Sequence, residues 1–430
     1  MACTGSGVQI PSAPQILVKF LYIKEIYLQT KELISSQFLI AIIAVLQVSY
    51  VVKQLGVENF GMVTLIITLP SLIFRATHSR NSDVTLLALK KGSNVFTESI
   101  IFDFLIGLFS FSVCFLIFYS ELGSYFGIKE ITPVILLYLF SRIVQTFSET
   151  SKAILIFQGK MKSFSLLEFV TVLVRFLSIL FLFSINASIE NYLISQTIYS
   201  LGYGLIGIYL ATKYEKFEST NFDKLSKYFN RIKKSYGKLR FDQILGLIPQ
   251  HFDVILLGVV SDISSVGIYK FAKKLIEPII YVVVTFNPWL QNKLKNSYET
   301  FEINTFFKQI LLPLSFLISI FYVVFGRNII SILGSEEFVD SYAPMLILLI
   351  GFIFYLYTFW IRQYLLFNDL ITFHAYGRLI YSGVFLLLSI SLVGTYSSIG
   401  IAISLSSAMV LQKTYAVSYT HLTLPTILRV

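Results

Sequence analysis

Long apolar stretches recur along almost the whole chain, and each has the length that crosses a lipid bilayer. A helix needs about 20 mainly apolar residues to span a hydrocarbon core of roughly 30 Å, where it satisfies its own backbone polar groups. Twelve such stretches follow one another, at residues 33–52, 56–77, 99–120, 131–157, 164–185, 190–212, 241–260, 266–290, 304–325, 341–363, 375–394 and 396–413. The sequence therefore predicts an all-α polytopic membrane protein with about 12 transmembrane helices.

The composition agrees with folding in lipid. Of 430 residues, 55% are hydrophobic and 13% are charged, whereas soluble domains carry about 25% charged residues. The net charge of +10 does not predict a nucleic-acid partner, because most Lys and Arg residues lie in short segments between apolar stretches. The two cysteines, Cys3 and Cys114, lie in unrelated contexts and predict neither a disulfide framework nor a thiolate metal site.

Positive charge alternates from loop to loop and predicts the orientation of the chain. Most Lys and Arg residues lie before residue 33 and in the loops at 78–98, 158–163, 213–240 and 291–303. The intervening loops carry only Lys53, Lys129 and Arg327. Because positive charge resists translocation across the membrane, we expect the basic loops and both termini to lie in the cytoplasm.

A long basic segment after the sixth stretch divides the chain into two halves. The expected organisation is a cytoplasmic N-terminus at 1–32, a six-helix bundle at 33–212, a basic cytoplasmic linker at 213–240, a second six-helix bundle at 241–413 and a tail at 414–430. Leu55-Gly56 in the first half is echoed by Leu257-Gly258 in the second. Two repeats of six helices enter the membrane with the same polarity, so we predict parallel repeats around a central cavity.

The two ends of the chain differ in character from the rest. Residues 1–15 resemble a translated transfer-RNA gene, and residues 417–430 resemble a translated sequencing adapter. Our hypothesis is that both segments are artefacts of assembly or annotation, which resequencing of the locus would test.

Polar residues recur at helical spacing within four of the apolar stretches. Charged residues inside a membrane helix are costly unless they face a cavity or a partner. The stripes are Arg142, Gln145, Glu149 and Lys152; Glu168 and Arg175; Gln243, Gly246, Gln250 and Asp253; and Lys270, Lys274 and Glu277. A water-filled lumen lined by the four helices explains all of these stripes together.

The lumen residues favour an anionic substrate. The candidate substrate-cavity residues are Arg142, Arg175, Lys270, Lys274, Gln145 and Gln250. Guanidinium groups make bidentate contacts to phosphate or carboxylate oxygens, and Arg142 and Arg175 lie nearest the middle of their stretches. The alternative is that these arginines form purely structural ion pairs with neighbouring carboxylates.

Three carboxylates are candidates for proton or sodium coupling. Glu149, Asp253 and Glu277 lie within apolar stretches, where a buried carboxylate can titrate as its neighbours change. An equally weighted alternative makes them counter-ions of the nearby basic residues. Charges nearer the predicted cytoplasmic ends, Arg75, Asp103, Lys152, Asp242, Arg362 and Arg378, are expected to act mainly as interfacial anchors.

Motifs typical of enzymes are missing from the sequence. It contains no GxxxxGK[ST] phosphate loop, no HExxH motif and no Cys/His cluster, so we expect no nucleotide hydrolysis and no metal or other cofactor. The longest predicted external loop, 327–340, is too short for a polymerase active site. We therefore predict a transporter and not an enzyme.

Two segments resemble the Wzx-type O-antigen and polysaccharide flippases of the multidrug/oligosaccharidyl-lipid/polysaccharide exporter superfamily. One is Leu55-Gly56-Val57-Glu58-Asn59-Phe60-Gly61. The other is Asp253-Val254-Ile255-Leu256-Leu257-Gly258 running on to Val266-Gly267-Ile268-Tyr269-Lys270-Phe271-Ala272-Lys273-Lys274-Leu275, with Pro288 beyond it.

This resemblance implies a V-shaped pair of bundles that translocates an undecaprenyl-diphosphate-linked oligosaccharide across the bacterial cytoplasmic (inner) membrane. The product would serve O-antigen, lipopolysaccharide or capsule synthesis, with membrane lipids and the polysaccharide polymerase machinery as partners. Cationic lumen residues of the family match Arg142, Arg175, Lys270 and Lys274 by position. The alternative within the same architecture is a cation-coupled drug or metabolite antiporter.

Overall fold

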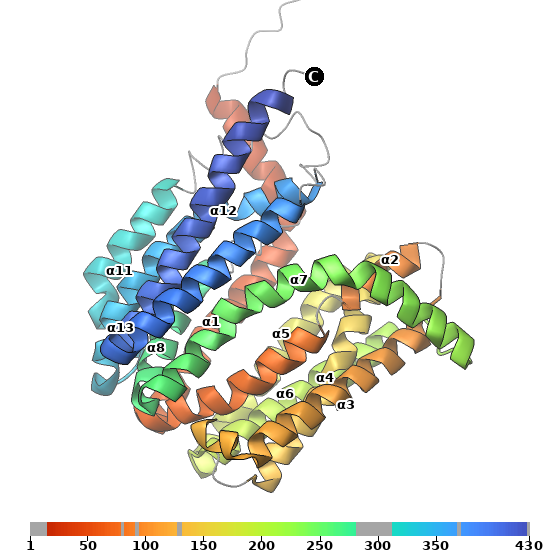
Figure 1. The fold of residues 1–430 in the computed structure, drawn as a ribbon, viewed down its shortest axis with the longest axis horizontal. Helices are drawn as coiled ribbons and strands as arrows, with labels where there is room; N and C mark the ends of the chain where they lie inside the picture. The colour runs from red at the N-terminus through yellow and green to blue at the C-terminus, as the bar shows by residue number, and fades with distance from the viewer. Residues whose placement is uncertain are drawn as a thin grey trace, which may run out of the picture.

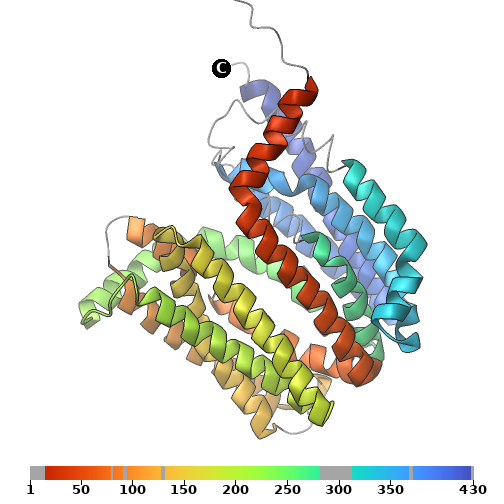
Figure 2. The same ribbon diagram turned by 180° about the vertical axis from the view of Figure 1, so that it is seen from behind.

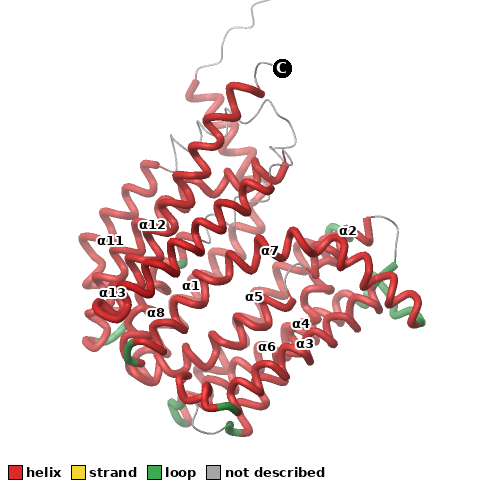
Figure 3. Tube along the Cα trace, viewed as in Figure 1, coloured by secondary structure: helices red, strands yellow, loops and turns green. Residues whose placement is uncertain are grey.

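A computed structural model describes residues 15–78, 81–90, 94–126, 131–280, 312–367 and 371–427. Within these ranges the chain is helical and contains no strand (Figure 3), which confirms the all-α prediction. The helices are α1 (Gln15–His78), α2 (Asn81–Lys90), α3 (Phe96–Tyr119), α4 (Pro133–Phe157), α5 (Met161–Ile185), α6 (Ile189–Ala211), α7 (Phe222–Val260), α8 (Ile263–Ile276), α11 (Leu312–Leu333), α12 (Tyr342–Phe367) and α13 (Ile371–Ile427), with short 3-10 helices η1 (Glu121–Phe126) and η4 (Glu336–Ser341).

Two of the helices each contain a pair of predicted spans. The backbone of α1 breaks at Gly56, where φ is 73°, a left-handed conformation that glycine adopts without steric cost. The backbone of α13 breaks at Ser397, where φ is 44°, and its hydroxyl lies 2.9 Å from the Ser261 hydroxyl at the end of α7. Both breaks fall at or beside predicted span boundaries, so hydropathy located these turns.

Length and apolarity identify membrane-crossing helices in both halves. Among the described residues, seven helical segments are long and apolar enough to cross a bilayer, at Gln37–Leu86, Phe96–Tyr119, Lys162–Ile185, Ile189–Ala211, Leu312–Leu333, Glu336–Leu356 and Phe373–Ser418. The first and last of these contain the backbone breaks. In α4, α7 and α8 the apolar residues are interrupted by charges. The predicted spans 266–290 and 304–325 lie partly outside the described residues.

The helices form two bundles that diverge from one end (Figures 1 and 2). The N-terminal bundle comprises α1 to α6, with α4 packed between α3 and α6 and with α5 against α1 and α6. The C-terminal bundle comprises α8, α11, α12 and α13 together with the second half of α7. The arrangement is a V, as the family resemblance implies. The exact domain boundaries stay predictions.

The bundles touch at a close contact between the two repeated glycine motifs. A Cβ atom on Gly61 would lie 2.1 Å from the Ile263 carbonyl oxygen, and one on Gly267 would lie 2.3 Å from the Val57 carbonyl oxygen. Only glycine permits such an approach. The contact is reciprocal, because Ile263 lies four positions before Gly267 and Val57 lies four positions before Gly61. We call this contact the closed end.

Polar caps fix where several helices begin. The side chains of Thr132, Ser188, Asn221 and Asp262 accept hydrogen bonds from the backbone N–H three residues later, which satisfies a donor that the first helical turn leaves free. The Asn221 cap lies inside the segment 213–240, which the sequence assigns to a solvated linker. From Phe222 onward that segment is instead the first part of α7, which reaches back to the N-terminal bundle (Figure 1).

Candidate functional site

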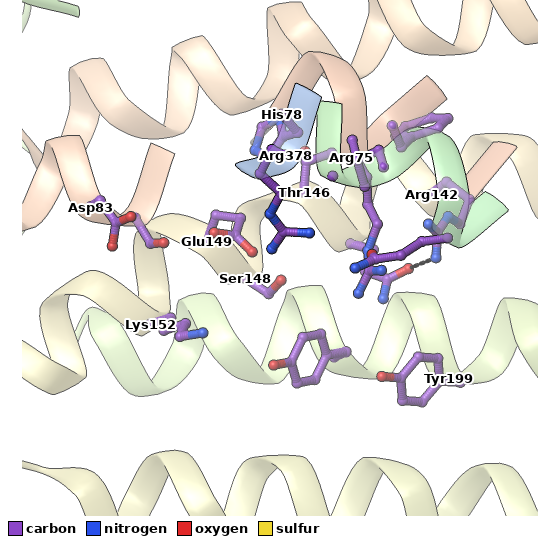
Figure 4. Close-up of a pocket in the computed structure, with 17 residues that line it drawn as sticks. Arg75, His78, Asp83, Arg142, Thr146, Ser148, Glu149, Lys152, Tyr199 and Arg378 are labelled. Atoms are coloured by element: carbon purple, nitrogen blue, oxygen red, sulfur yellow. Dashed lines mark hydrogen bonds between the residues drawn. The ribbon is translucent and has the colours of Figure 1, made fainter. Parts of the chain in front are cut away.

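A polar cavity lies between the two bundles. Its volume is about 620 Å³, within the range of roughly 300–1,000 Å³ that is usual for ligand sites. The lining residues come from α1, α2, α4, α6, α7 and α13: Phe74, Arg75, His78, Ser82, Asp83, Arg142, Gln145, Thr146, Ser148, Glu149, Lys152, Tyr199, Tyr203, Gly246, Leu247, Gln250 and Arg378 (Figure 4). The central cavity predicted from the stripes is present, although its walls include α1, α6 and α13.

Three arginines from different helices line this cavity. Arg75 belongs to α1, Arg142 to α4 and Arg378 to α13, and their side chains converge in Figure 4. The sequence assigned Arg75 and Arg378 to interfacial anchoring, because both lie near predicted span ends. The structure places them on the cavity wall, since the bundles diverge at this end and the space between them reaches the helix ends.

Arg142 is oriented from within its own bundle. Its guanidinium donates to the Gln145 side-chain oxygen, which also accepts from the Ser200 hydroxyl of α6 at 3.1 Å. The guanidinium carbon lies 5.6 Å from the centre of the Phe74 ring. These contacts hold Arg142 at the cavity without neutralising its charge.

Two of the arginines keep an unused hydrogen-bond donor. The Nε atoms of Arg142 and Arg378 are buried and have no hydrogen-bond partner within the described part of the chain. Because a buried donor without a partner is costly, such groups in a cavity indicate a ligand or ordered water. Arg142 and Arg378 come from opposite bundles, so a ligand that accepts from both would join them.

The wall of the cavity carries an excess of positive charge. Four cationic side chains, Arg75, Arg142, Lys152 and Arg378, face two carboxylates, Asp83 and Glu149. Within a membrane, charges of one sign concentrated in a cavity attract a ligand of the opposite sign. The wall therefore suits an anion.

Arg175 takes a different position from Arg142. It is absent from the lining of the cavity as far as the structure is described. Its Nε donates to the Gln47 side-chain oxygen at 3.0 Å, and its guanidinium carbon lies 4.7 Å from the centre of the Tyr199 ring. Arg175 thus lies outside the cavity and contacts Tyr199, which lines the cavity.

The predicted residues of α8 also lie away from the lining. Lys274 forms an ion pair with Glu277 at 2.5 Å, and neither these two residues nor Lys270 is among the described lining residues. Gln145, Gln250 and Glu149, by contrast, all line the cavity. The stripes of α4 and α7 therefore meet at one site, whereas those of α5 and α8 do not contribute to it.

Asp253 is enclosed within the C-terminal bundle. Its carboxylate is fully buried and forms an ion pair with Lys273, and it accepts a hydrogen bond of 2.6 Å from the Tyr269 hydroxyl. Lys273 is not one of the three residues of the predicted α8 stripe, Lys270, Lys274 and Glu277. This geometry favours the counter-ion interpretation of Asp253, because a buried charge requires a partner.

A second buried carboxylate, Asp103, lies beside the cavity in the N-terminal bundle. One of its oxygens lies 2.9 Å from His78 Nε2, although the two groups are not aligned as a hydrogen bond. Asp103 also accepts from Asn81 and, at 2.6 Å, from the Thr150 hydroxyl. The sequence did not predict this cluster, because Asp103 lies near the end of its span and was assigned to interfacial anchoring. The signal that could have indicated it is His78, at the end of the preceding span.

Solved structures with the same arrangement of helices are transporters. A lipid II flippase MurJ in an inward closed conformation superposes with a TM-score of 0.74 at 14% identity, over 90% of this chain and 87% of that one. An inward-facing multidrug resistance transporter of the MATE family, in the MOP superfamily, gives a TM-score of 0.70 at 11% identity over 91% and 96%. A Vibrio cholerae MATE transporter in its bent form gives 0.61 at 15% identity over 94% and 97%.

The chain therefore shares the fold of these solved structures, with helices in two bundles around a central cavity. Residues 30–292 match the family described as "Polysaccharide biosynthesis protein". This match covers more than half of the chain, and the chain belongs to that family. Curated protein sequences gave no match. The family resemblance suggested by the two glycine motifs is thus confirmed.

Proposed function

We propose that this protein is a flippase that translocates undecaprenyl-diphosphate-linked oligosaccharide repeat units across the bacterial cytoplasmic membrane. The observation that carries the proposal is the pair of arginines, Arg142 and Arg378, that bring unpartnered guanidinium donors from opposite bundles to one cavity. A diphosphate offers several anionic oxygens and can accept from both at once. The membership of the polysaccharide biosynthesis family supports a glycan as the cargo.

The shape of the molecule suits a lipid-linked substrate. The bundles diverge away from the closed end (Figures 1 and 2), and both expose large apolar side chains, such as Phe181 of α5 and Leu387 of α13. A polar head group would occupy the cavity while its lipid chain stays in the surrounding bilayer. Opening the closed end and closing the opposite one would then transfer the head group between leaflets.

The direction of opening follows from the loop charges. The cavity lies at the end of the molecule that holds the basic segments near His78 and Lys213, and the positive-inside rule assigns that end to the cytoplasm. On this assignment we propose that the open cavity receives substrate from the cytoplasmic leaflet and that both termini are cytoplasmic. The product would serve O-antigen, lipopolysaccharide or capsule synthesis, in proximity to the polymerase machinery.

Deletion of the gene tests this proposal. In a strain without another flippase, we expect lipid-linked repeat units to accumulate on the cytoplasmic leaflet, where a membrane-impermeant sugar-oxidising reagent cannot reach them in intact cells. Complementation with the wild-type gene should restore surface polysaccharide. Normal surface polysaccharide in the deletion strain would contradict the proposal.

A second candidate is a cation-coupled antiporter for drugs or metabolites. The observation that favours it is the presence of Glu149 and Asp83 on the cavity wall, because carboxylates there can exchange a proton or sodium ion for a cargo. Altered drug sensitivity with intact surface polysaccharide would support this alternative. In either case we propose that Glu149, which lines the cavity, is a stronger coupling candidate than Asp253 or Glu277, each of which has a lysine partner.

A further inference from the structure

Two tyrosines on one face of α6 give the polar cavity an aromatic wall. Tyr199 and Tyr203 lie one helical turn apart and both line the cavity. Their ring centres are 5.8 Å apart and the ring planes are inclined by only 12°. The two rings thus form a nearly continuous aromatic surface, which we call the tyrosine pair.

Contacts on two sides of α6 hold the Tyr199 end of the tyrosine pair in place. Arg175 of α5 covers Tyr199 from outside the cavity and is itself fixed by the buried Gln47 of α1. Ser200, beside Tyr199, donates to Gln145 of α4. Because these contacts order the aromatic side chain before any ligand arrives, little conformational entropy remains to be lost on binding. This packing gives Arg175 a positioning role.

The chemistry of the surroundings selects the kind of ligand that fits against these rings. An aromatic surface can bind a cation over its faces, but the cavity carries excess positive charge, and a guanidinium already covers Tyr199. A lipid chain is disfavoured by the polar neighbours Gln145, Ser148 and Glu149. A sugar ring matches both features, because its C–H face packs on aromatic carbon while its hydroxyl groups bond to amides, hydroxyls and carboxylates.

We propose that Tyr199 and Tyr203 form the carbohydrate-binding surface of the cavity and pack against the sugar nearest the diphosphate. This inference rests on the proposed flippase function. It divides the cavity into two parts, with the arginines binding the anionic linkage and the tyrosine pair binding the glycan. A ligand bound to both parts must carry a sugar directly attached to its phosphate groups.

Two short lipids separate these parts experimentally. The purified full-length protein in lipid nanodiscs is titrated with farnesyl-diphosphoryl-N-acetylglucosamine and with farnesyl diphosphate, the latter used as its terminal methyl ester so that both lipids carry the same charge. The two lipids then differ only in the group on the terminal phosphate, which is a sugar in one and a methyl group in the other. We expect the wild type to bind the glycosylated lipid about tenfold more tightly. The double variant Tyr199→Ala/Tyr203→Ala should lose this preference and keep its affinity for the methyl ester within about twofold, since the arginines remain.

Two control variants isolate the ring contribution. Tyr199→Phe/Tyr203→Phe keeps both rings and should keep most of the preference. Tyr209→Ala removes another tyrosine of α6 that also contacts a cation, since Lys213 Nζ lies 4.7 Å from its ring centre, but Tyr209 is 63% exposed and lies outside the cavity lining. This variant should bind both lipids as the wild type does.

The outcomes distinguish this inference from the proposed function. If the wild type binds neither lipid, the flippase proposal itself fails. If the wild type binds both lipids equally, or if the alanine double variant keeps the tenfold preference, the proposed carbohydrate-binding surface is contradicted. The proposed diphosphate site is then still supported. Retained binding of the methyl ester by the double variant also shows that the variant is folded.

Discussion

At the scale of single residues, the cavity depends on arginines whose charge is oriented but not neutralised. Arg142 is held by Gln145 and packs over Phe74, yet its Nε stays unpartnered in the described structure. The sequence identified Arg142 and Gln145 because they share a face of one helix. The sequence could not distinguish residues that face the cavity from residues inside a bundle. It therefore grouped Arg175 with Arg142 as a cavity residue and left Arg378 out of that group.

Removing the Arg142 guanidinium should abolish export. We expect Arg142→Ala to lower surface polysaccharide at least tenfold while the protein still inserts, and Arg142→Lys to keep partial activity because it preserves the charge but loses bidentate geometry. Surface polysaccharide is measured by immunoblotting alongside membrane protein level. Arg327→Ala is the matched control, because Arg327 is exposed on α11 over the Tyr342 ring. Wild-type export by Arg142→Ala would remove Arg142 from the substrate pathway.

The buried pair of Asp253 and Lys273 should behave as a structural ion pair. Lys273→Met leaves an unpaired carboxylate and should destabilise the protein by about 3–5 kcal/mol, whereas Asp253→Asn/Lys273→Met removes both charges and should recover most of that loss. Thermal unfolding in detergent, read together with export, checks this expectation. If the double variant is stable but does not export, Asp253 has a role in coupling and not only in structure.

At the scale of elements, α7 joins part of the predicted linker 213–240 and a predicted span in one helix. Hydropathy predicted an apolar stretch at 241–260, and α7 is apolar from Ile244 to Val260. The basic composition of 213–240 indicated solvent, and most of the described side chains there are exposed. Tyr228 is the buried exception among them and is only 3% exposed. Its hydroxyl lies 3.1 Å from the Thr85 hydroxyl and donates to Asn81 at 3.3 Å. A single aromatic residue in a charged segment was too weak a pattern to predict this packing.

Loss of the Tyr228 side chain should release the first part of α7. We expect Tyr228→Ala to increase trypsin cleavage within 213–240 several-fold in inverted membrane vesicles, because it removes both hydrogen bonds and the packing against the Phe102 ring, 6.0 Å away. Tyr228→Phe should give a smaller increase. Phe222→Ala, at an 83% exposed position of the same helix, should leave cleavage unchanged. Equal cleavage of all variants would show that Tyr228 does not anchor the segment.

The helices that line the cavity also show what a single sequence can predict. Charged stripes located α4 and α7 correctly, because charge in a membrane helix must face something polar. The contribution of α6 was missed, since Tyr199 and Tyr203 resemble the aromatic residues common throughout membrane helices. The rotation of each helix about its axis depends on packing between helices, which residue spacing does not specify.

At the scale of the whole molecule, alternating access requires the closed end to separate. Phe60 of α1 and Phe338 of η4 meet there, with ring centres 6.2 Å apart. In a background with Cys3 and Cys114 replaced by serine, we expect Phe60→Cys/Phe338→Cys to stop export after treatment with a short bifunctional thiol reagent. The cross-link would join the bundles at the end that has to open.

The C-terminal half offers a matched control for this cross-link. Phe271 and Phe338 are closer, with ring centres 4.8 Å apart, but α8 and η4 pack together on one side of the closed end. Treated Phe271→Cys/Phe338→Cys should therefore export as well as the untreated protein. Continued export by the cross-linked Phe60 and Phe338 variant would mean that the closed end does not separate during transport.

The reciprocal approach of Gly61 and Gly267 gives the closed end the geometry of an isologous interface. In such an interface each partner presents the same patch to the other, as in two-fold symmetric homodimers. Two separate copies of a six-helix chain would make this same contact without any further adaptation. Duplication and fusion of an ancestral gene would then have preserved an existing gate, and a split version of this protein, expressed as two halves, should reassemble through it.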